Sequence, residues 1–254
     1  MVSEPLAARG PRRVRLCRTP TLFLLLSLLW LPLWAQEIVY VTATNHTEPL
    51  SRFERGQLTG GIIKDLGDAL ARRMGLRPRY LLMPSKRAPM ALRQGEGDLL
   101  CYTRPQWIGP DFRFTLPLIP NAEVVAARPE APRLRTLADL ADRPVGTVLG
   151  YRYAEAEAAL GERLRRQDAP DMQANLRKLV ARRMDYAITD RLVLREHQRR
   201  RPEDGLREDV VLNAYTAPCA LSPRSPLKLD DVNAALAEMV ADGELQRILA
   251  AYGR

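Results

Sequence analysis

The chain has 254 residues and a formal net charge of +9, with Lys and Arg at 39 positions and Asp and Glu at 30. The basic residues are spread along the sequence, and Arg199 to Arg201 form the one compact run, which is typical of a solvated helix face. Two histidines, His46 and His197, and three cysteines occur without any CxxC or HExxH motif. We therefore expect no nucleic-acid partner, no metal site and no cofactor.

The first 35 residues are typical of an export signal. Five arginines precede an apolar run from Thr21 to Trp34, and the small residue Ala35 follows it. The run is 14 residues long, whereas a helix that spans a membrane needs about 20. We expect cleavage near Ala35 and a soluble periplasmic protein of 219 residues. Its net charge would be +5, because the leader removes five arginines and one glutamate from the total of +9.

Strand-like and helix-like segments alternate from Ile38 onward, which favours mainly parallel sheets covered by helices. The first helix has apolar residues at helical spacing and ends at Gly75, a residue type that commonly terminates helices. The order of these strand-like and helix-like segments predicts a βαβαβ unit. Its expected strands cover residues 38–42, 80–83 and 98–102, and its expected helices cover 62–74 and 88–93.

A proline-rich stretch from Pro105 to Pro132 follows, with 123–126 as its one strand-like segment, and we expect it to cross between two halves without forming a core. A second α/β cycle opens at Thr136, an N-cap candidate. A closing amphipathic helix is interrupted at Gly243. Two cycles separated by extended segments predict two lobes joined by a hinge. The second cycle predicts strands over 145–148, 185–188 and 210–212, a further segment at 217–221, and helices over 154–166, 172–184 and 191–199.

The order of these landmarks resembles the family 3 extracellular solute-binding proteins, the receptors of polar amino-acid ABC importers. The resemblance covers Ile38 to Tyr252. It implies a type II periplasmic-binding-protein-like α/β fold, with mainly parallel sheets flanked by helices. One lobe would contain residues 36–128 and 214–254, and the other 129–213. The landmarks include Gly95-Glu96-Gly97-Asp98, Phe114-Thr115-Leu116-Pro117, Leu137-Ala138-Asp139-Leu140, Arg183-Met184-Asp185-Tyr186 and Asp242-Gly243.

Two shorter motifs resemble a less typical branch of this family, which has Pro-Trp-Lys-Arg-Ala after the second strand and Gly-Tyr-Ser-Tyr at the entry to lobe two. Here they are Pro84-Ser85-Lys86-Arg87-Ala88, without the aromatic residue, and Gly150-Tyr151-Arg152-Tyr153. Typical members clamp a ligand carboxylate with the arginine of a Thr-x-x-Arg stretch after the third strand. This chain departs from that pattern, because Arg104 directly follows Thr103.

Open α/β sheets bind ligands beyond the carboxyl ends of their strands. Arg104 follows the third strand and is a candidate for a paired hydrogen bond to a carboxylate. The helix predicted to begin at Ala154 has free N–H groups that favour an anion. Asp190 resembles the acid that pairs with a ligand amine. The candidate ligand-binding residues are Glu48, Arg87, Tyr102, Thr103, Arg104, Gly150, Tyr151, Arg152, Tyr153 and Asp190.

Ordinary structural roles compete with several of these assignments. Arg104 is also consistent with a surface arginine, Tyr151 and Tyr153 with core aromatics, and Asp190 with an N-cap for the helix that follows it. Cys101 and Cys219 remain after cleavage, and the resemblance places them on neighbouring strands. Both a disulfide and two buried thiols remain open.

We expect a monomeric binding protein that captures a small polar solute, an amino acid or a related carboxylated amine, and presents it to an ABC-transporter membrane component. We expect no catalysis. One alternative is an exported enzyme on the same fold, such as a cyclohexadienyl dehydratase, with Glu48 or Asp190 as the acid or base. Another is a ligand-sensing partner of a membrane receptor.

Overall fold

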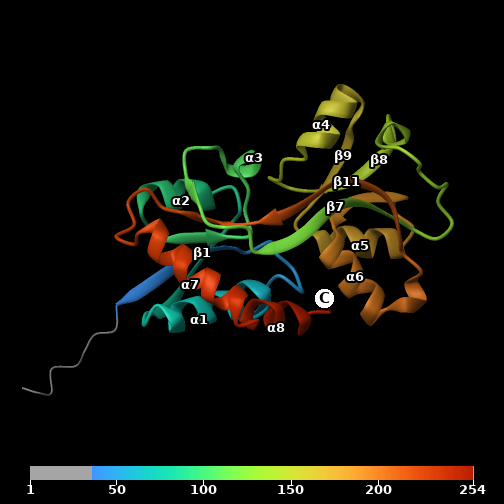
Figure 1. Ribbon diagram of the computed structural model, residues 1–254. Coiled ribbons are helices and arrows are strands. Elements are labelled where there is room, and N and C mark those ends of the chain that lie inside the picture. Colours follow the sequence, from blue (N-terminus) through green and yellow to red (C-terminus); the bar gives the residue numbers. More distant parts are fainter. Residues whose placement is uncertain (1–35, 254) are drawn as a thin grey trace, which may run out of the picture. The chain divides into compact units, whose positions relative to one another are not determined.

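The structure is a computed structural model that describes residues 36–253 (Figure 1). The predicted signal peptide lies outside these residues. Residues 36–253 form two five-stranded sheets and one two-stranded sheet, with helices on the faces of the larger two. No helix within this range combines the length and the apolar character needed to cross a bilayer.

The first sheet has the strand order β4-β1-β5-β12-β6. The strands β4, β1 and β5 pair in parallel, and β12 is antiparallel to both of its neighbours, so β12 alone opposes the common direction. This sheet contains the expected βαβαβ unit. Its strands are β1 (Glu37–Ala43), β4 (Arg77–Met83), β5 (Leu99–Cys101), β6 (Arg113–Phe114) and β12 (Cys219–Leu221).

Helices cover both faces of the first sheet because its strands alternate apolar side chains between the two faces. Tyr40 packs in one core with Leu66 and Leu236, while the adjacent Val41 packs in another core with Leu92. One face is covered by α1 (Ile62–Arg73), α7 (Leu229–Ala241) and α8 (Glu244–Ala250), and the other by α2 (Ala88–Gln94) (Figure 1). Four short elements were not expected: β2 (Arg52–Glu54), β3 (Gln57–Gly60), α3 (Pro105–Ile108) and the edge strand β6.

The second sheet has the order β11-β7-β10-β8-β9, and β7 alone opposes the common direction. Its strands are β7 (Ile119–Ala127), β8 (Pro144–Val148), β9 (Arg165–Ala169), β10 (Tyr186–Asp190) and β11 (Arg207–Ala217). Its helices are α4 (Ala154–Leu160), α5 (Met172–Val180) and α6 (Arg191–Arg200), with 3₁₀ turns η2 (Leu137–Leu140), η3 (Gly161–Arg163) and η4 (Pro202–Asp204). The apolar cores place α5 and α6 on one face and α4 with η2 on the other.

The expectation that residues 105–132 avoid a core is wrong for β7. The side chains of Ala122, Val124, Val125 and Ala126 are fully buried. β7 pairs with β10 on one side and with β11 on the other, so it is an interior strand with both faces covered. Such a strand has a continuous apolar run rather than an alternating one.

The predicted helix over 154–166 is too long. α4 ends at Leu160, Gly161 has a left-handed φ of 51°, and the chain then forms β9 beside β8. β9 is an edge strand with polar side chains, so it has little apolar signal. The helix predicted over 172–184 ends at Val180, and Arg182 has a positive φ of 56°.

Several local signals read from the sequence are confirmed. Thr136 caps η2 in a reciprocal arrangement with Asp139, whose carboxylate accepts a hydrogen bond from the Thr136 N–H at 2.9 Å. Gly75 follows α1 with a φ of 69°, and Gly243 separates α7 from α8 with a φ of 76°. Glycine reaches these left-handed conformations without the steric cost that other residues incur.

Cys101 and Cys219 form a disulfide that closes a chain separation of 118 residues. The two residues are direct partners in the β5–β12 register. The bridge ties the strand that precedes Tyr102 to a strand from the far end of the sequence.

The two sheets are connected by the chain segment 115–118, between β6 and β7, and by Pro218, between β11 and β12. The lobe boundaries at residues 128 and 214 remain a prediction. By hydrogen bonding, β7 belongs to the second sheet, although the predicted boundary follows it.

Candidate functional site

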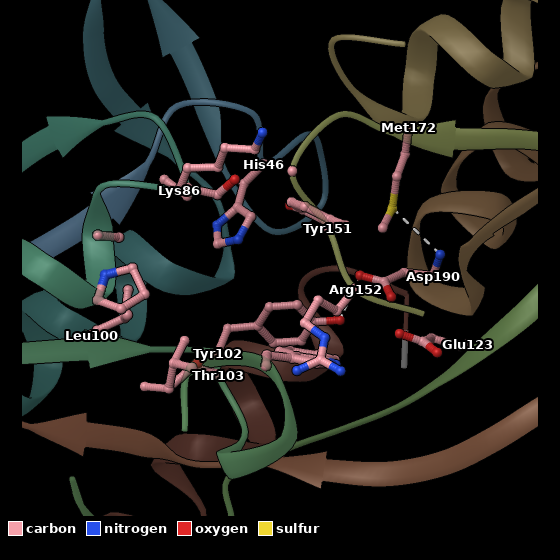
Figure 2. Close-up of a pocket in the computed structure, with 17 residues that line it drawn as sticks. His46, Lys86, Leu100, Tyr102, Thr103, Glu123, Tyr151, Arg152, Met172 and Asp190 are labelled. Atoms are coloured by element: carbon pink, nitrogen blue, oxygen red, sulfur yellow. Dashed lines mark hydrogen bonds between the residues drawn. The ribbon is translucent and has the colours of Figure 1, made fainter. Parts of the chain in front are cut away.

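A cavity of about 290 Å³ lies where loops after the strands of both sheets meet. Parallel strands that end at the same edge leave such a crevice for ligands. Figure 2 shows His46 and Lys86 on one side of this pocket and Asp190 and Glu123 on the other. The residues that line the cavity include His46, Lys86, Tyr102, Trp107, Glu123, Gly150, Tyr151, Arg152 and Asp190.

Tyr102 is held in place by a network of buried polar groups. It follows β5 with a positive φ of 58°, a conformation that costs energy in a tyrosine. Its hydroxyl donates to Asp190 Oδ2 at 2.6 Å, and the Tyr215 hydroxyl donates to Asp190 Oδ1 at 3.0 Å. The Asn121 side-chain nitrogen donates a hydrogen bond to the Tyr102 hydroxyl, and its Oδ1 accepts a hydrogen bond from the Leu192 N–H. The network links the end of β5 to the end of β10.

Asp190 is 3 % exposed and forms no ion pair with a described cation. Burial raises its pKa from 3.8 to about 6, although the hydrogen bonds from Tyr102 and Tyr215 act in the opposite direction. Asp190 is the N-cap residue of α6, but its side chain makes no capping hydrogen bond. The carboxylate therefore faces the pocket with two tyrosine donors and without a countercharge.

Glu123 is a second buried carboxyl group in the pocket, and sequence analysis treated it only as part of a strand. It is 5 % exposed, and the Asn213 amide donates to its Oε2 at 3.3 Å. Burial raises its pKa from 4.5 to about 8, and the charge of Asp190 adds to this shift. The sequence does contain a signal for this role. A glutamate within an otherwise apolar, buried strand needs a polar or charged partner, which indicates a binding site.

His46 also lines the pocket, although sequence analysis assigned it no role and noted only that no metal-binding motif surrounds it. Burial lowers its pKa from 6.5 to about 4, so the ring is neutral at pH 7. Its Nδ1 is buried without a hydrogen-bond partner, and its ring packs edge-on against Tyr102 at 5.8 Å. His46 therefore presents an unused polar nitrogen beside the pocket.

The predicted segment Gly150–Arg152 does line the pocket. Gly150 has a φ of 88°, and a Cβ there would lie 2.8 Å from carbon atoms of the Lys86 side chain, so the lysine packs directly against the glycine. Lys86 and Arg152 are both exposed, and they place two positive charges at the pocket. The motif Pro84–Ala88 suggested Arg87 as a ligand-binding residue. Its charged side chain at the pocket is instead Lys86, one position earlier.

The predicted anion site at the start of α4 is not supported. Glu157 Oε1 accepts the Tyr153 N–H at 3.1 Å, and Glu155 and Glu157 both lie in the first turn of α4. These carboxylates already interact with the positive end of the helix. Tyr153 lies in the core, where its hydroxyl accepts the Val148 N–H at 2.9 Å.

Arg104 lies beside the pocket but does not line it. Its guanidinium lies over the rings of Trp107 and Tyr215, at 5.3 and 4.5 Å from their centroids. Its Nη1 donates to Asn213 Oδ1 at 3.4 Å. Thr103, which follows Tyr102, does line the pocket.

Two further candidates lie away from this pocket. Glu48 forms an ion pair with Arg200 beside a separate cavity of about 280 Å³. Arg87 is exposed and immediately precedes α2. Their roles in ligand binding remain predictions. Within residues 36–253, no group of three or more His, Cys, Asp or Glu side chains is arranged to hold a metal ion.

Comparisons with known proteins agree with this architecture. An ancestral arginine-binding protein bound to arginine has a TM-score of 0.73 and 20% identity, over 87% of this chain and 99% of that chain. The arginine-, lysine-, histidine-binding protein ArtJ from Geobacillus stearothermophilus has a TM-score of 0.70 and 20% identity, over 86% and 95%. An ancestral amino acid-binding protein described as a precursor of cyclohexadienyl dehydratase has a TM-score of 0.72 and 20% identity, over 86% and 95%.

At these identities the similarity concerns the fold, and it confirms the predicted periplasmic-binding-protein-like α/β class. The comparison with curated proteins found no match. The sequence itself matches one family over residues 39–254, which is most of the chain. The chain therefore belongs to the bacterial extracellular solute-binding proteins, family 3.

Proposed function

We propose that the protein captures a small amino acid or related carboxylated amine in the pocket between β5 and β10. The supporting observation is the separation of charge around the pocket. Asp190 is buried on one side without a countercharge, and Lys86 and Arg152 are exposed at the same cavity. A solute with an ammonium group and a carboxylate complements both charges. The cavity of about 290 Å³ is at the small end of the usual range for small-molecule sites.

Lys86 and Arg152 take the role that sequence analysis gave to Arg104. Lys86 forms no ion pair with a described carboxylate, and Arg152 has only a long contact of 3.9 Å with Glu157. Both side chains are therefore available to a ligand carboxylate. Arg104, in contrast, already packs on two aromatic rings.

A thermal-shift screen of the purified protein against the twenty amino acids, simple amines and simple carboxylic acids tests this proposal. A ligand present at 100 times its dissociation constant adds about 2.7 kcal/mol of stability. For a domain of this size, that corresponds to a rise in Tm of roughly 5 to 10 °C. If no amino acid or carboxylated amine raises the Tm, the proposal is wrong.

Two substitutions then locate the ligand. Asp190→Asn removes the buried charge and should weaken binding about a hundredfold, since losing one partner of a buried charge pair costs several kcal/mol. Lys86→Met should weaken binding of carboxylate-bearing ligands, while Lys178→Met, on α5 outside the pocket, should not. Equal affinity of all three variants and the unmodified protein would reject the site.

We further propose that the protein is exported and delivers its solute to an ABC importer as a monomer. The family to which the chain belongs is extracellular, and the predicted leader agrees with that location. Deletion of the gene should abolish uptake of the identified solute by intact cells. Fractionation should recover the protein from the periplasm with residues 1–35 removed.

Ligand binding is proposed to close two lobes around the pocket, with residues 115–118 and Pro218 as the hinge. These are the two connections between the sheets, and domain closure commonly uses a few such residues. X-ray scattering should show a smaller radius of gyration with the solute than without it. An unchanged radius would reject the closure.

A second candidate function is an enzyme. Glu123 carries its proton at neutral pH, because its pKa is raised to about 8, and a protonated carboxyl group in a pocket is a general-acid candidate. The purified protein should then show cyclohexadienyl dehydratase activity that Glu123→Gln abolishes. Absence of turnover together with saturable solute binding would reject this candidate.

A further inference from the structure

Glu123 and Asp190 are direct neighbours across two strands. The antiparallel register of β7 and β10 pairs Glu123 with Asp190, and the register of β7 and β11 pairs Glu123 with Asn213. Side chains directly opposite in such a pair lie on one face, with Cβ atoms about 4.5 to 5.5 Å apart, and like charges there are destabilising. On this face of the sheet, the buried apolar pair Ile188 and Val125 is followed by the acidic pair Asp190 and Glu123, which lines the pocket.

Neither acid is neutralised by a cation within residues 36–253. Among the described residues, the Glu123 side chain receives one hydrogen bond, from the Asn213 amide to Oε2, and none of them donates to its Oε1. The charge of Arg104 lowers the pKa of Glu123, but its Nη1 donates to the side-chain oxygen Oδ1 of Asn213 and not to the carboxylate. Both carboxyl groups are more than nine-tenths buried, and both line the cavity.

The rest of the wall favours an organic cation. Three aromatic side chains, Tyr102, Trp107 and Tyr151, line the same cavity, and their ring faces attract ammonium and guanidinium groups. No described cluster of acids and histidines is arranged to hold a metal ion. A ligand with one ammonium group would pair with Asp190 and leave Glu123 without a cationic partner.

We propose that Glu123 makes the pocket select solutes that carry two cationic nitrogen groups or a guanidinium, such as basic amino acids and their amines, over neutral amino acids. This rests on the proposed function, because it names the class of solute that the same pocket takes. Glu123 is then the residue that sets specificity. Asp190 provides the first negative charge. Glu123 is protonated in the ligand-free pocket and provides the second charge by releasing its proton to water when a second cationic group binds beside it.

Isothermal titration calorimetry with charged and neutral ligands of matched shape tests the proposal. The pairs are L-arginine with L-citrulline and L-lysine with L-norleucine, and agmatine and CaCl₂ serve as separate probes. The unmodified protein should bind the charged member of at least one pair a hundredfold or more tighter than its neutral counterpart. Glu123→Gln should reduce that ratio at least tenfold. Glu162→Gln, an exposed glutamate without an ion pair, should leave it unchanged.

The outcomes separate the two proposals. Tight binding of neutral amino acids, or a ratio that Glu123→Gln does not change, overturns this inference and leaves the proposed function standing. Binding of agmatine without any amino acid supports the cation subsite and rejects the amino-acid assignment. Binding of Ca²⁺ in place of the organic cations overturns the inference. No binding of any probe also overturns it, whereas the proposed function is rejected only if the thermal-shift screen finds no amino acid or carboxylated amine that binds. A melting curve of the Glu123→Gln variant verifies that it is folded.

Discussion

Glu123 should make the ligand-free protein less stable as the pH rises, and Glu123→Gln should remove that effect. Burial raises the pKa of Glu123 from 4.5 to about 8, so the folded state holds its proton more tightly than the unfolded state does. The stabilising contribution of this proton is complete below the unfolded pKa and is lost as the pH rises through the folded pKa. The sensitive window therefore lies between about pH 4.5 and 8.

The magnitude follows from the same shift. Each pH unit inside the window changes the free energy of unfolding by at most about 1.4 kcal/mol, which gives an upper limit of about 5 kcal/mol over the whole window. Glu123 and Asp190 titrate as a coupled pair, so only part of this limit belongs to Glu123, and we expect a change of roughly 2 kcal/mol. A glutamine does not titrate, and any cost of the amide itself is the same at every pH.

The assay is urea unfolding at pH 5, 6.5 and 8 without ligand or reductant. The free energy of unfolding of Glu123→Gln, minus that of the unmodified protein, should increase by about 2 kcal/mol from pH 5 to pH 8. Glu162→Gln makes the same replacement at an exposed side chain and should show no such increase. A difference that is constant over the three pH values would refute the assignment of Glu123 as a buried, neutral acid.

Two further effects should be measurable. Replacing Cys101 and Cys219 together by serine should lower the free energy of unfolding by about 2 to 5 kcal/mol, because the bridge closes a long chain segment of 118 residues; thermal melts that do not differ would contradict this. Gly150→Ala should lower the free energy of unfolding by more than the roughly 1 kcal/mol expected of a positive φ alone, because its Cβ would contact Lys86. Gly56 also has a positive φ, of 75°, but faces open space, so Gly56→Ala measures the backbone cost by itself. Equal losses of stability in the two glycine variants would show that the Lys86 contact is unimportant.

Local and repetitive features of the fold could be predicted from the sequence. The strand around Tyr40 and the helix that ends before Gly75 follow from apolar spacing and terminator residues, and both occur as expected. These signals act over a few residues, so the sequence contains them directly. The order of the elements was also sufficient for the family resemblance, which the match over residues 39–254 confirms.

Sequence patterns also identified part of the pocket. Tyr102, Tyr151 and Asp190 lie at or just beyond the ends of strands, at the edges where α/β sheets bind ligands, and all three line the cavity. Position along the chain could not distinguish Lys86 from Arg87, because which of two adjacent side chains faces a cavity depends on the packing of the loop.

Only the tertiary structure decided which charges lack partners. Glu123 and Asp190 are 67 positions apart, and the β7–β10 register makes them neighbours. Arg104 looked available from its position after β5, but the aromatic rings of Trp107 and Tyr215 hold its guanidinium beside the pocket. Strand register and side-chain packing join residues that are distant in the sequence, and the free energy of a buried charge depends on those neighbours more than on the local pattern of residues.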